Sequence, residues 1–318
     1  MSQRILVLGA AGRFGYAAAE AFRKAGWQVT SLVRPGAAHR APPGTKVVET
    51  IDRLVAIEAA RGKDIVLHAL NPPLKTWRRM ALPHAYAAIE AAETAGATLM
   101  FPGNLFNYGK PMPEVIDEST PMQPTSRKGE IRVEIEQRMR EASDRGMRAI
   151  ILRAGDFFGS GRGSWFDLVI AKDVTRAEVT YPGPLDVAHE WAYVPDLVAG
   201  TVQLAAKRDQ LGMFETFGFP GHAVTGRELV GAIARAVGRQ SHDIRMKKMS
   251  WWLIHLLSPV VPLPRELSEL AYLWKVPHRI AGDKLKAAIG EVPHTPLDTA
   301  VARALKVLGP TERQQRAH

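Results

Sequence analysis

The stretch "RILVLGAAGRFG", residues 4–15, decides the fold. Residues 4–8 form a short apolar run, which predicts a buried strand of a parallel sheet. An alanine-rich segment over 13–25, ended by Gly26, predicts a helix directly after this strand. Gly9, Gly12 and Gly15 occupy the strand-to-helix junction. The start of the chain is therefore expected to form the first unit of an alternating strand–helix fold.

The three glycines of this junction have separate physical roles. Gly9 permits a tight turn out of the strand, Gly12 lets a pyrophosphate approach the backbone, and Gly15 allows the helix to pack closely. The free N–H groups and the dipole of the helix then face the phosphates. We therefore expect a dinucleotide phosphate loop, whose contacts also include the following residues: Ala11, Arg13 and Phe14.

Strands and helices continue to alternate at short intervals along the first half of the chain. Further strands are predicted over 27–34, 45–50, 64–70, 98–103 and 147–155, and helices over 54–62, 79–95 and 128–145. This order predicts an α/β fold with a Rossmann-type, doubly wound parallel sheet.

The second half of the chain predicts a smaller, mainly helical lobe that binds substrate. A helix over 193–208 and a strand over 212–219 return to the sheet. Further helices are predicted over 225–239, 250–258, 264–274, 281–290 and 295–309. The NAD(P)-binding domain is therefore expected over 1–156 plus about 186–219, and the interleaved lobe over about 157–185 plus 220–310. Residues 311–318 are expected to form a tail.

Composition narrows the classes of function. The chain has 318 residues and a net charge of +10, but its Lys and Arg are scattered, so no nucleic-acid partner is expected. It lacks cysteine and any HExxH-type pair, so no metal site is expected. The apolar stretch over 251–264 is too short to span a bilayer and is interrupted by prolines. The chain also starts without a signal peptide, so we expect a cytoplasmic protein with no membrane partner.

The residues after the second strand bear on the choice of dinucleotide. Asp or Glu near this point would bind the ribose hydroxyls of NAD, but the chain has Arg34 there and Arg13 in the loop. Guanidinium groups suit a 2′-phosphate, so NADP(H) is favoured over NAD(H). Asp52 is a candidate contact for the adenine. The dinucleotide is expected to cross the sheet edge at the end of the fourth strand, at His68, Ala69, Leu70 and Asn71.

The order of several motifs resembles that of a known family. "GAAGRFG", "DIVLHAL", "NLFNYG", "LRAGDFFG" and "HEWAYVPDLV" are similar to segments of atypical or extended short-chain dehydrogenases/reductases, the NAD-dependent epimerase/dehydratase group with its NmrA-like relatives. The resemblance covers about residues 4–220. It implies a Ser or Thr after the fifth strand and a YxxxK pair on the next helix, with the Tyr exchanging a proton and the Lys holding the nicotinamide ribose. It also implies a possible homodimer.

The chain departs from this pattern where the resemblance places the chemistry. Gly103 or Asn104 takes the Ser position, and Lys128 takes the Tyr position. Arg132, followed by Glu136, takes the Lys position and is expected to bind the ribose or a phosphate. Lys128 can act as a general acid only if desolvation or a neighbouring cation, such as Arg132 or Arg127, lowers its pKa. The alternative is a basic helix start that binds phosphate or faces solvent.

Other side chains are candidates for proton transfer. Asn104 can hydrogen-bond a carbonyl or hydroxyl, and Tyr108 lies on a loop that the family places near the substrate. Asp156 follows the sixth strand, near the ligand crevice, although capping a turn is an alternative role. A residue near His189 is implied to lie close to the substrate.

Two functions remain open at this stage. One is an NADP(H)-dependent oxidoreductase or epimerase/dehydratase-like enzyme that acts on a small carbonyl or hydroxyl metabolite and lacks the usual Tyr. The other is a non-catalytic NAD(P)-sensing protein, NmrA-like, that binds partners. Apolar helices after residue 160 and the glycine-rich loop over 159–163, which could form a lid, favour the enzyme.

Overall fold

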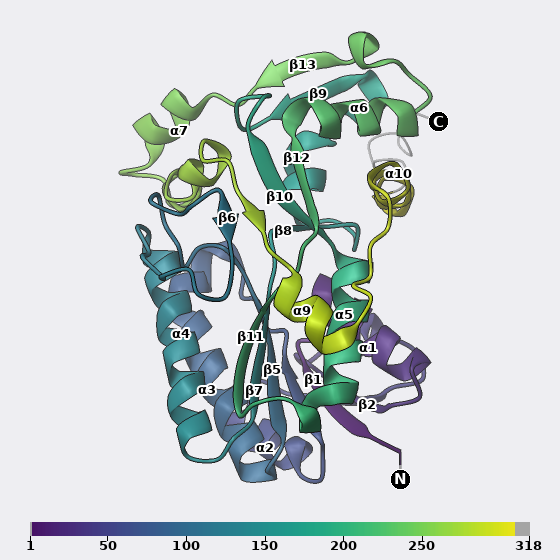
Figure 1. Ribbon diagram of the computed structural model, residues 1–318, viewed down its shortest axis with the longest axis vertical. Coiled ribbons are helices and arrows are strands. Elements are labelled where there is room, and N and C mark those ends of the chain that lie inside the picture. The colour runs from purple at the N-terminus through teal and green to yellow at the C-terminus, as the bar shows by residue number, and fades with distance from the viewer. Residues whose placement is uncertain (1, 309–318) are drawn as a thin grey trace.

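A seven-stranded parallel sheet forms the centre of the molecule (Figure 1). The computed structural model describes residues 2–308, so the expected tail over 311–318 lies outside the described residues. The strands are β1 (Arg4–Leu8), β2 (Gln28–Val33), β3 (Lys46–Glu49), β4 (Ile65–His68), β5 (Thr98–Gly103), β7 (Ala149–Arg153) and β11 (Phe214–Gly218). Their order across the sheet is β11-β7-β5-β4-β1-β2-β3, which confirms the Rossmann-type fold.

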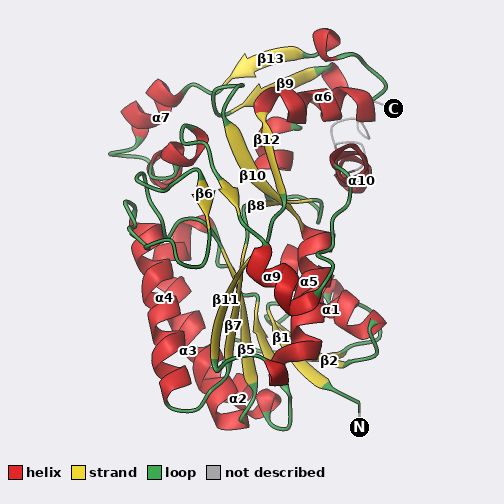
Figure 2. Cartoon of the chain, viewed as in Figure 1, coloured by secondary structure: helices red, strands yellow, loops and turns green. Residues whose placement is uncertain are grey.

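Helices cover both faces of this sheet (Figure 2). One face carries α1 (Arg13–Lys24), α5 (Val194–Lys207) and α9 (Asp283–Ile289), which contact one another and share one buried apolar cluster with the strands. The other face carries α2 (Arg53–Ala60), α3 (Trp77–Ala95) and α4 (Arg127–Asp144), which share a second cluster. The mainly apolar strands β1, β4 and β7 lie between the two clusters because both of their faces are covered.

The smaller lobe lies beyond the carboxyl ends of the sheet strands (Figure 1). Its helices are α6 (Gly226–Ala236), α7 (Trp251–Leu257), α8 (Pro262–Ser268) and α10 (Leu297–Leu308). Its strands are β8 (Asp156–Phe158), β9 (Glu178–Tyr181), β10 (Ala188–Tyr193), β12 (His222–Thr225) and β13 (Arg245–Lys248). A third apolar cluster, which includes Phe166, Trp191 and Trp274, forms its core.

The lobe differs in detail from the expectation of helices alone. Its strands form the small sheets β12-β10-β8 and β13-β9, and β14 (Arg279–Ile280) pairs with β6 (Val115–Ile116). The helix predicted over 264–274 is divided, because α8 ends at Ser268 and a 3₁₀ turn covers Ala271–Trp274. Helix α9, which we expected in the lobe, packs on α5 and β11 of the main sheet. The domain boundaries themselves stay a prediction.

Candidate functional site

The phosphate loop joins β1 to α1 as expected. Gly9 has φ +88°, and a Cβ there would lie 2.9 Å from the Ala69 carbonyl oxygen. A Cβ on Gly15 would lie 2.3 Å from the Gly9 carbonyl oxygen, so only glycine lets the helix pack this closely. The Gly12 N–H donates to the Gly9 carbonyl at 2.9 Å and closes the turn. This cradle of bare backbone beside a helix N-terminus fits the pyrophosphate of a dinucleotide.

The other expected loop residues have distinct surroundings. Phe14 is buried and packs on Phe157, with ring centroids 5.8 Å apart. The Ala11 carbonyl accepts from Arg40 Nη2 at 3.3 Å. Arg40 is exposed and lies on the short 3₁₀ turn after β2, so a second guanidinium lies beside the loop. Arg40 was not among the predicted contacts, because it lies on a separate turn after β2 and not at the end of the strand.

Arg13 points toward the lobe rather than toward the second strand. A Cβ on Gly163 would lie 3.1 Å from Arg13 Nε, so the Arg13 guanidinium packs on the glycine-rich loop. Burial lowers the pKa of Arg13, and the nearby Asp167 and Asp156 oppose this. Its Nη1 is buried and has no partner among the described residues. This position suits a phosphate contact at the mouth of the lobe and does not suit the adenosine 2′-phosphate that we expected it to contact.

Arg34 and Asp52, the residues expected near the adenosine, lie after β2 and at the start of α2. Arg34 is exposed just beyond the end of β2. Asp52, our candidate adenine contact, caps α2, where its carboxylate accepts from the Leu54 N–H at 2.7 Å. Asn71 accepts from Trp77 Nε1 at 2.9 Å, which fixes the segment after β4.

His68, at the end of β4, lies in an aromatic setting together with Arg132. Its ring stacks on Phe101 at 5.2 Å between centroids, and burial lowers its pKa to about 3. The Arg132 guanidinium lies over the rings of Phe101 and Trp77, at 5.0 and 5.4 Å. Burial lowers the pKa of Arg132 to about 10, its Nε has no hydrogen-bond partner, and it has no ion pair among residues 2–308. The Arg132 guanidinium therefore has N–H groups free to donate to a ribose or phosphate oxygen.

Glu136, one turn after Arg132, has a structural role. Its carboxylate accepts from Arg153 Nη1 and Nη2 at 2.9 and 2.7 Å, and from Asn107 Nδ2 at 2.9 Å. Asn104 uses its side-chain oxygen locally, accepting from the Phe106 N–H at 3.1 Å. At Gly103 a Cβ would lie 3.0 Å from Ile151 Cγ2, which leaves little room for a serine.

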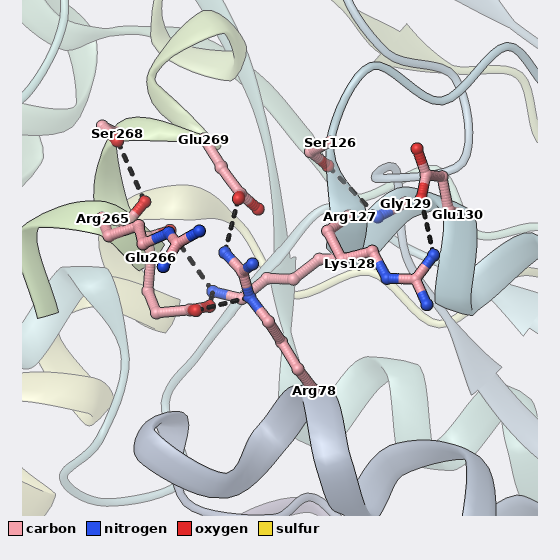
Figure 3. Close-up of polar contacts among 10 residues, drawn as sticks. All are labelled: Arg78, Ser126, Arg127, Lys128, Gly129, Glu130, Arg265, Glu266, Ser268 and Glu269. Atoms are coloured by element: carbon pink, nitrogen blue, oxygen red, sulfur yellow. Dashed lines mark hydrogen bonds and ion pairs between the residues drawn. The ribbon is translucent and has the colours of Figure 1, made fainter. Parts of the chain in front are cut away.

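Lys128 is buried and is held by the lobe (Figure 3). Its Nζ lies 2.9 Å from Glu266 Oε2 of α8, and it donates to the Glu266 carbonyl at 3.3 Å. Glu266 also pairs with Arg78 of α3 at 2.6 Å, and Arg78 in turn contacts Glu269. Burial lowers the pKa of Lys128, whereas Glu266 opposes this. The four residues form one network that joins α8 to α3 and α4.

The cations that we expected to act on Lys128 are arranged differently. Arg127 turns to the surface and pairs with Glu130 at 2.8 Å. Arg78, which the sequence did not indicate, contributes to the lowering of the Lys128 pKa. Lys128 therefore neither faces solvent nor is free to bind phosphate, because its ammonium group is paired with Glu266.

Tyr108 is buried and faces the β11 side of the sheet. It lines a cavity of about 100 Å³ together with Ile116, Glu118, Arg153 and Gly218. Arg153 lies over its ring at 5.2 Å, and burial raises the pKa of the phenol. None of the residues around this cavity belongs to the phosphate loop or to the Arg132 site.

Asp156 and His189 form a close pair where the lobe meets the sheet domain. Asp156 is in β8 and His189 in β10, adjacent strands of one small sheet. Asp156 Oδ2 lies 3.0 Å from His189 Nε2, while His189 Nδ1 lies 3.3 Å from the Leu273 carbonyl. A carbonyl can only accept, so the contact with Leu273 uses a hydrogen on Nδ1. The pair brings an imidazole and a carboxylate, two side chains commonly used in general acid–base catalysis, into direct contact.

Residues that the sequence analysis missed complete the surroundings of the pair. Trp274 stacks on the His189 ring with centroids 4.3 Å apart, and His278 meets it edge-on at 4.7 Å. The Tyr272 hydroxyl is buried and has no partner among the described residues. Burial raises the pKa of Tyr272 to about 12, and Asp156 adds to this. Residues 271–274 were expected to be ordinary helix, so no sequence signal indicated their position beside His189.

With this geometry in place, comparison with known proteins identifies the family. The family model described as "NAD dependent epimerase/dehydratase family" matches residues 5–217. The chain belongs to this family. No curated protein sequence matches it.

Solved structures with similar folds share little sequence with this family member. MoeE5 in complex with UDP-glucuronic acid and NAD has a TM-score of 0.74 at 18% identity, with all of both chains covered. The UDP-Glc/GlcNAc 4-epimerase of Campylobacter jejuni has a TM-score of 0.73 at 16% identity, with 98% of this chain and 100% of that chain covered. TunA, an NAD-dependent NDP-hexosamine 5,6-dehydratase, has a TM-score of 0.71 at 16% identity, with 96% and 97% covered. At these identities the likeness establishes the fold.

Proposed function

We propose that the protein is a dinucleotide-dependent oxidoreductase or epimerase/dehydratase-like enzyme that acts on a hydroxyl or carbonyl group of a small metabolite. The Asp156–His189 pair carries this proposal, because it places an imidazole and a carboxylate in contact near Arg13, where the lobe meets the sheet domain. The neighbours named above act on or bind sugar nucleotides, so this substrate class comes first in a screen.

Each part of the proposed site has its own role in the reaction. The dinucleotide, when bound, supplies the hydride chemistry. Arg132 holds the nicotinamide ribose or an adjacent phosphate, in the position of the family's Lys. The Asp156–His189 pair gives a proton to, or takes one from, the reacting oxygen of the substrate, and replaces the missing phenol. The unpartnered Tyr272 hydroxyl donates a hydrogen bond that orients this oxygen.

Three of the earlier candidates have a different place in this proposal. Lys128 holds α8 in position, because its ammonium group is already paired with Glu266. Tyr108 and Asn104 support the loop after β5, since Tyr108 lines a separate cavity and Asn104 bonds its own loop.

Turnover by variants of the pair tests the function. In a screen of carbonyl compounds and sugar nucleotides with NADPH and NADP, His189→Asn and Asp156→Asn are each expected to lower kcat by about 100-fold or more. Dinucleotide affinity, measured by fluorescence, is expected to stay within about twofold of the wild-type value. His222→Asn, a buried histidine of β12 outside the pair, is the matched control. Wild-type turnover in both pair variants would remove them from the proposal.

The preference for NADP(H) is a separate proposal. It is supported by Arg34, exposed beyond β2, by Arg40 beside the loop, and by the absence of an acidic side chain at the end of β2. Arg34→Ala and Arg40→Ala are expected to weaken NADPH binding about tenfold and to leave NADH binding unchanged. Arg145→Ala, an exposed arginine paired with Glu93 of α3, is the control. Equal affinity of the wild-type protein for NADPH and NADH contradicts the assignment.

An NAD(P)-sensing regulatory protein is the second candidate, supported by the absence of the family's Tyr. It predicts dinucleotide binding without turnover of any compound in the screen. A cytoplasmic location and a homodimer are also kept as proposals. Light scattering of the purified protein tests the homodimer.

A further inference from the structure

The outer side of the α7–α8 segment is an exposed apolar surface. The exposed fractions are 70% for Trp252, 65% for Leu256 and 79% for Val260. Four more large apolar side chains are exposed beside them: Leu253, Leu257, Val261 and Leu263. We call these seven residues the α7–α8 apolar face. Such a concentration within 12 positions is uncommon on a soluble surface and marks a contact site.

The opposite side of the same segment is anchored to the protein. Trp251 Nε1 donates to the Pro182 carbonyl at 2.5 Å, and Trp251 packs against the lobe core. Glu266 of α8 is fixed by Lys128 and Arg78 (Figure 3). Because α7 is apolar on both its inner and its outer side and residues 2–308 leave the outer side exposed, a binding partner is expected to cover that side.

The segment that carries the face has basic residues and no acidic ones. Asp243 and Glu266 are the acidic residues nearest in sequence on either side, and no Asp or Glu lies between them. Arg245, Lys247, Lys248 and Arg265 lie within this interval, and all are exposed. Arg245 and Lys247 share one partner, Glu178, so a positive excess remains.

We propose that the α7–α8 apolar face docks on the surface of an anionic lipid bilayer. Trp and Leu beside basic residues are the side chains that bind the headgroup boundary and attract anionic lipids. No helix among the described residues is long and apolar enough to cross a membrane, so the contact is limited to the surface. A second copy is a poorer occupant, because a symmetric contact would bring like charges together.

This proposal revises the expectation that the protein has no membrane partner. That expectation rested on the length of residues 251–264, which bears on spanning a bilayer and not on lying at its surface. The proposal is independent of the proposed function, since none of the seven residues belongs to the dinucleotide site.

Sedimentation with vesicles tests the proposal. The full chain is mixed with vesicles of phosphatidylcholine alone, or of equal parts phosphatidylcholine and phosphatidylglycerol. Binding is expected with the anionic vesicles, is expected to fall as salt rises, and is expected to shift tryptophan emission to the blue. The variant Trp252→Ser/Leu256→Ser/Val260→Ser is expected to lose at least about tenfold in binding. Lys248→Gln/Arg265→Gln is expected to lose about fivefold per charge.

A matched control comes from two exposed apolar side chains outside the lobe. Ile51→Ser/Leu54→Ser changes side chains that are 88% and 66% exposed near α2, and is expected to bind vesicles like the wild type. Dinucleotide affinity of every variant reports that it is folded and separates this test from that of the proposed function. The proposal is overturned if the wild type does not bind anionic vesicles or if the triple variant binds equally well. A wild-type dimer that the triple variant loses would assign the face to a second copy instead.

Discussion

Lys128 and Arg132 lie one turn apart on α4 and have opposite surroundings. Lys128 has a carboxylate partner in the lobe, whereas Arg132 lies between aromatic rings with no carboxylate partner among the described residues. A buried cation that is paired with a carboxylate serves a structural role, whereas a buried cation without an ion-pair partner is available to bind a ligand. This difference decides which of the two we assign to the cofactor.

The role of Lys128 is tested by separating stability from turnover. Lys128→Met leaves Glu266 with Arg78 as its remaining ion-pair partner, and is expected to lower the free energy of unfolding by up to about 3 kcal/mol. Adding Glu266→Gln is expected to restore part of this loss. Urea unfolding measures the free energy of unfolding of the single and the double variant. If turnover of Lys128→Met falls by orders of magnitude while its stability is unchanged, Lys128 is catalytic after all.

Arg132 is tested through the dinucleotide. Arg132→Met is expected to weaken NADPH binding by about 10- to 100-fold, because hydrogen bonds to a charged group contribute about 1.5–3 kcal/mol. Arg132→Lys is expected to recover little of it, since an ammonium group cannot stack on two rings as a guanidinium does. Fluorescence titration measures both, with Arg138→Met on the exposed side of α4 as the control. Unchanged affinity in Arg132→Met would move the ribose contact elsewhere.

At the scale of elements, the junction between β1 and α1 is the part that the sequence determines most closely. Gly15→Ala places a Cβ 2.3 Å from a backbone oxygen, so α1 must move away from the loop. We expect dinucleotide affinity to fall at least about tenfold and unfolding to become easier. Gly200→Ala in α5 meets Phe219 at an ordinary 3.7 Å and is expected to stabilise the protein by up to about 1 kcal/mol. Similar affinity in both variants would contradict the close-packing argument.

The strands that escaped prediction share a physical reason. The central predicted strands β1, β4 and β7 are mainly apolar and buried, whereas β13 reads "RMKK" and is exposed at every position. Strand β10 reads "AHEWAY", in which the buried His189 and Glu190 interrupt the apolar pattern. Short strands of this kind are fixed by their neighbours in space, so their own residues carry little signal.

The same reason explains why the sequence predicted one part of the candidate site and missed another. The phosphate loop is continuous in sequence and joins β1 to α1 as expected, while its contacts with a cofactor stay a prediction. The Asp156–His189 pair joins residues 33 positions apart, and the Lys128–Glu266 pair joins residues 138 positions apart. No spacing rule connects such residues, because the fold of the lobe sets their distance.

For the whole molecule, three buried histidines and one buried glutamate set the response to acid. Burial lowers the pKa of His68 to about 3, and of His222 and His278 to about 4. The unfolded chain therefore binds these protons first as pH falls below about 6.5, and stability is lost toward pH 4. Burial raises the pKa of Glu190 to about 7, so its contribution has the opposite sign and is lost as pH rises through 7.

Between pH 4.5 and 6.5 the three histidines outweigh the one glutamate. We therefore expect a lower Tm at pH 5 than at pH 7.5, with each net proton contributing up to about 1.4 kcal/mol per pH unit. His222→Asn is expected to flatten this dependence, and Glu190→Gln to steepen it. Calorimetry across this range measures both slopes. A Tm that rises on acidification would contradict the assignment of the neutral histidines.

Helix α8 carries two contacts of different kinds within three residues. Leu263 faces outward, while Glu266 holds Lys128 in the first turn of α4. Helix α8 therefore connects the outer surface to the first turn of α4, and Arg132 lies one turn further along α4. The Lys128–Glu266 pair is thus the contact at which the proposed docking surface and the proposed cofactor site adjoin in the fold.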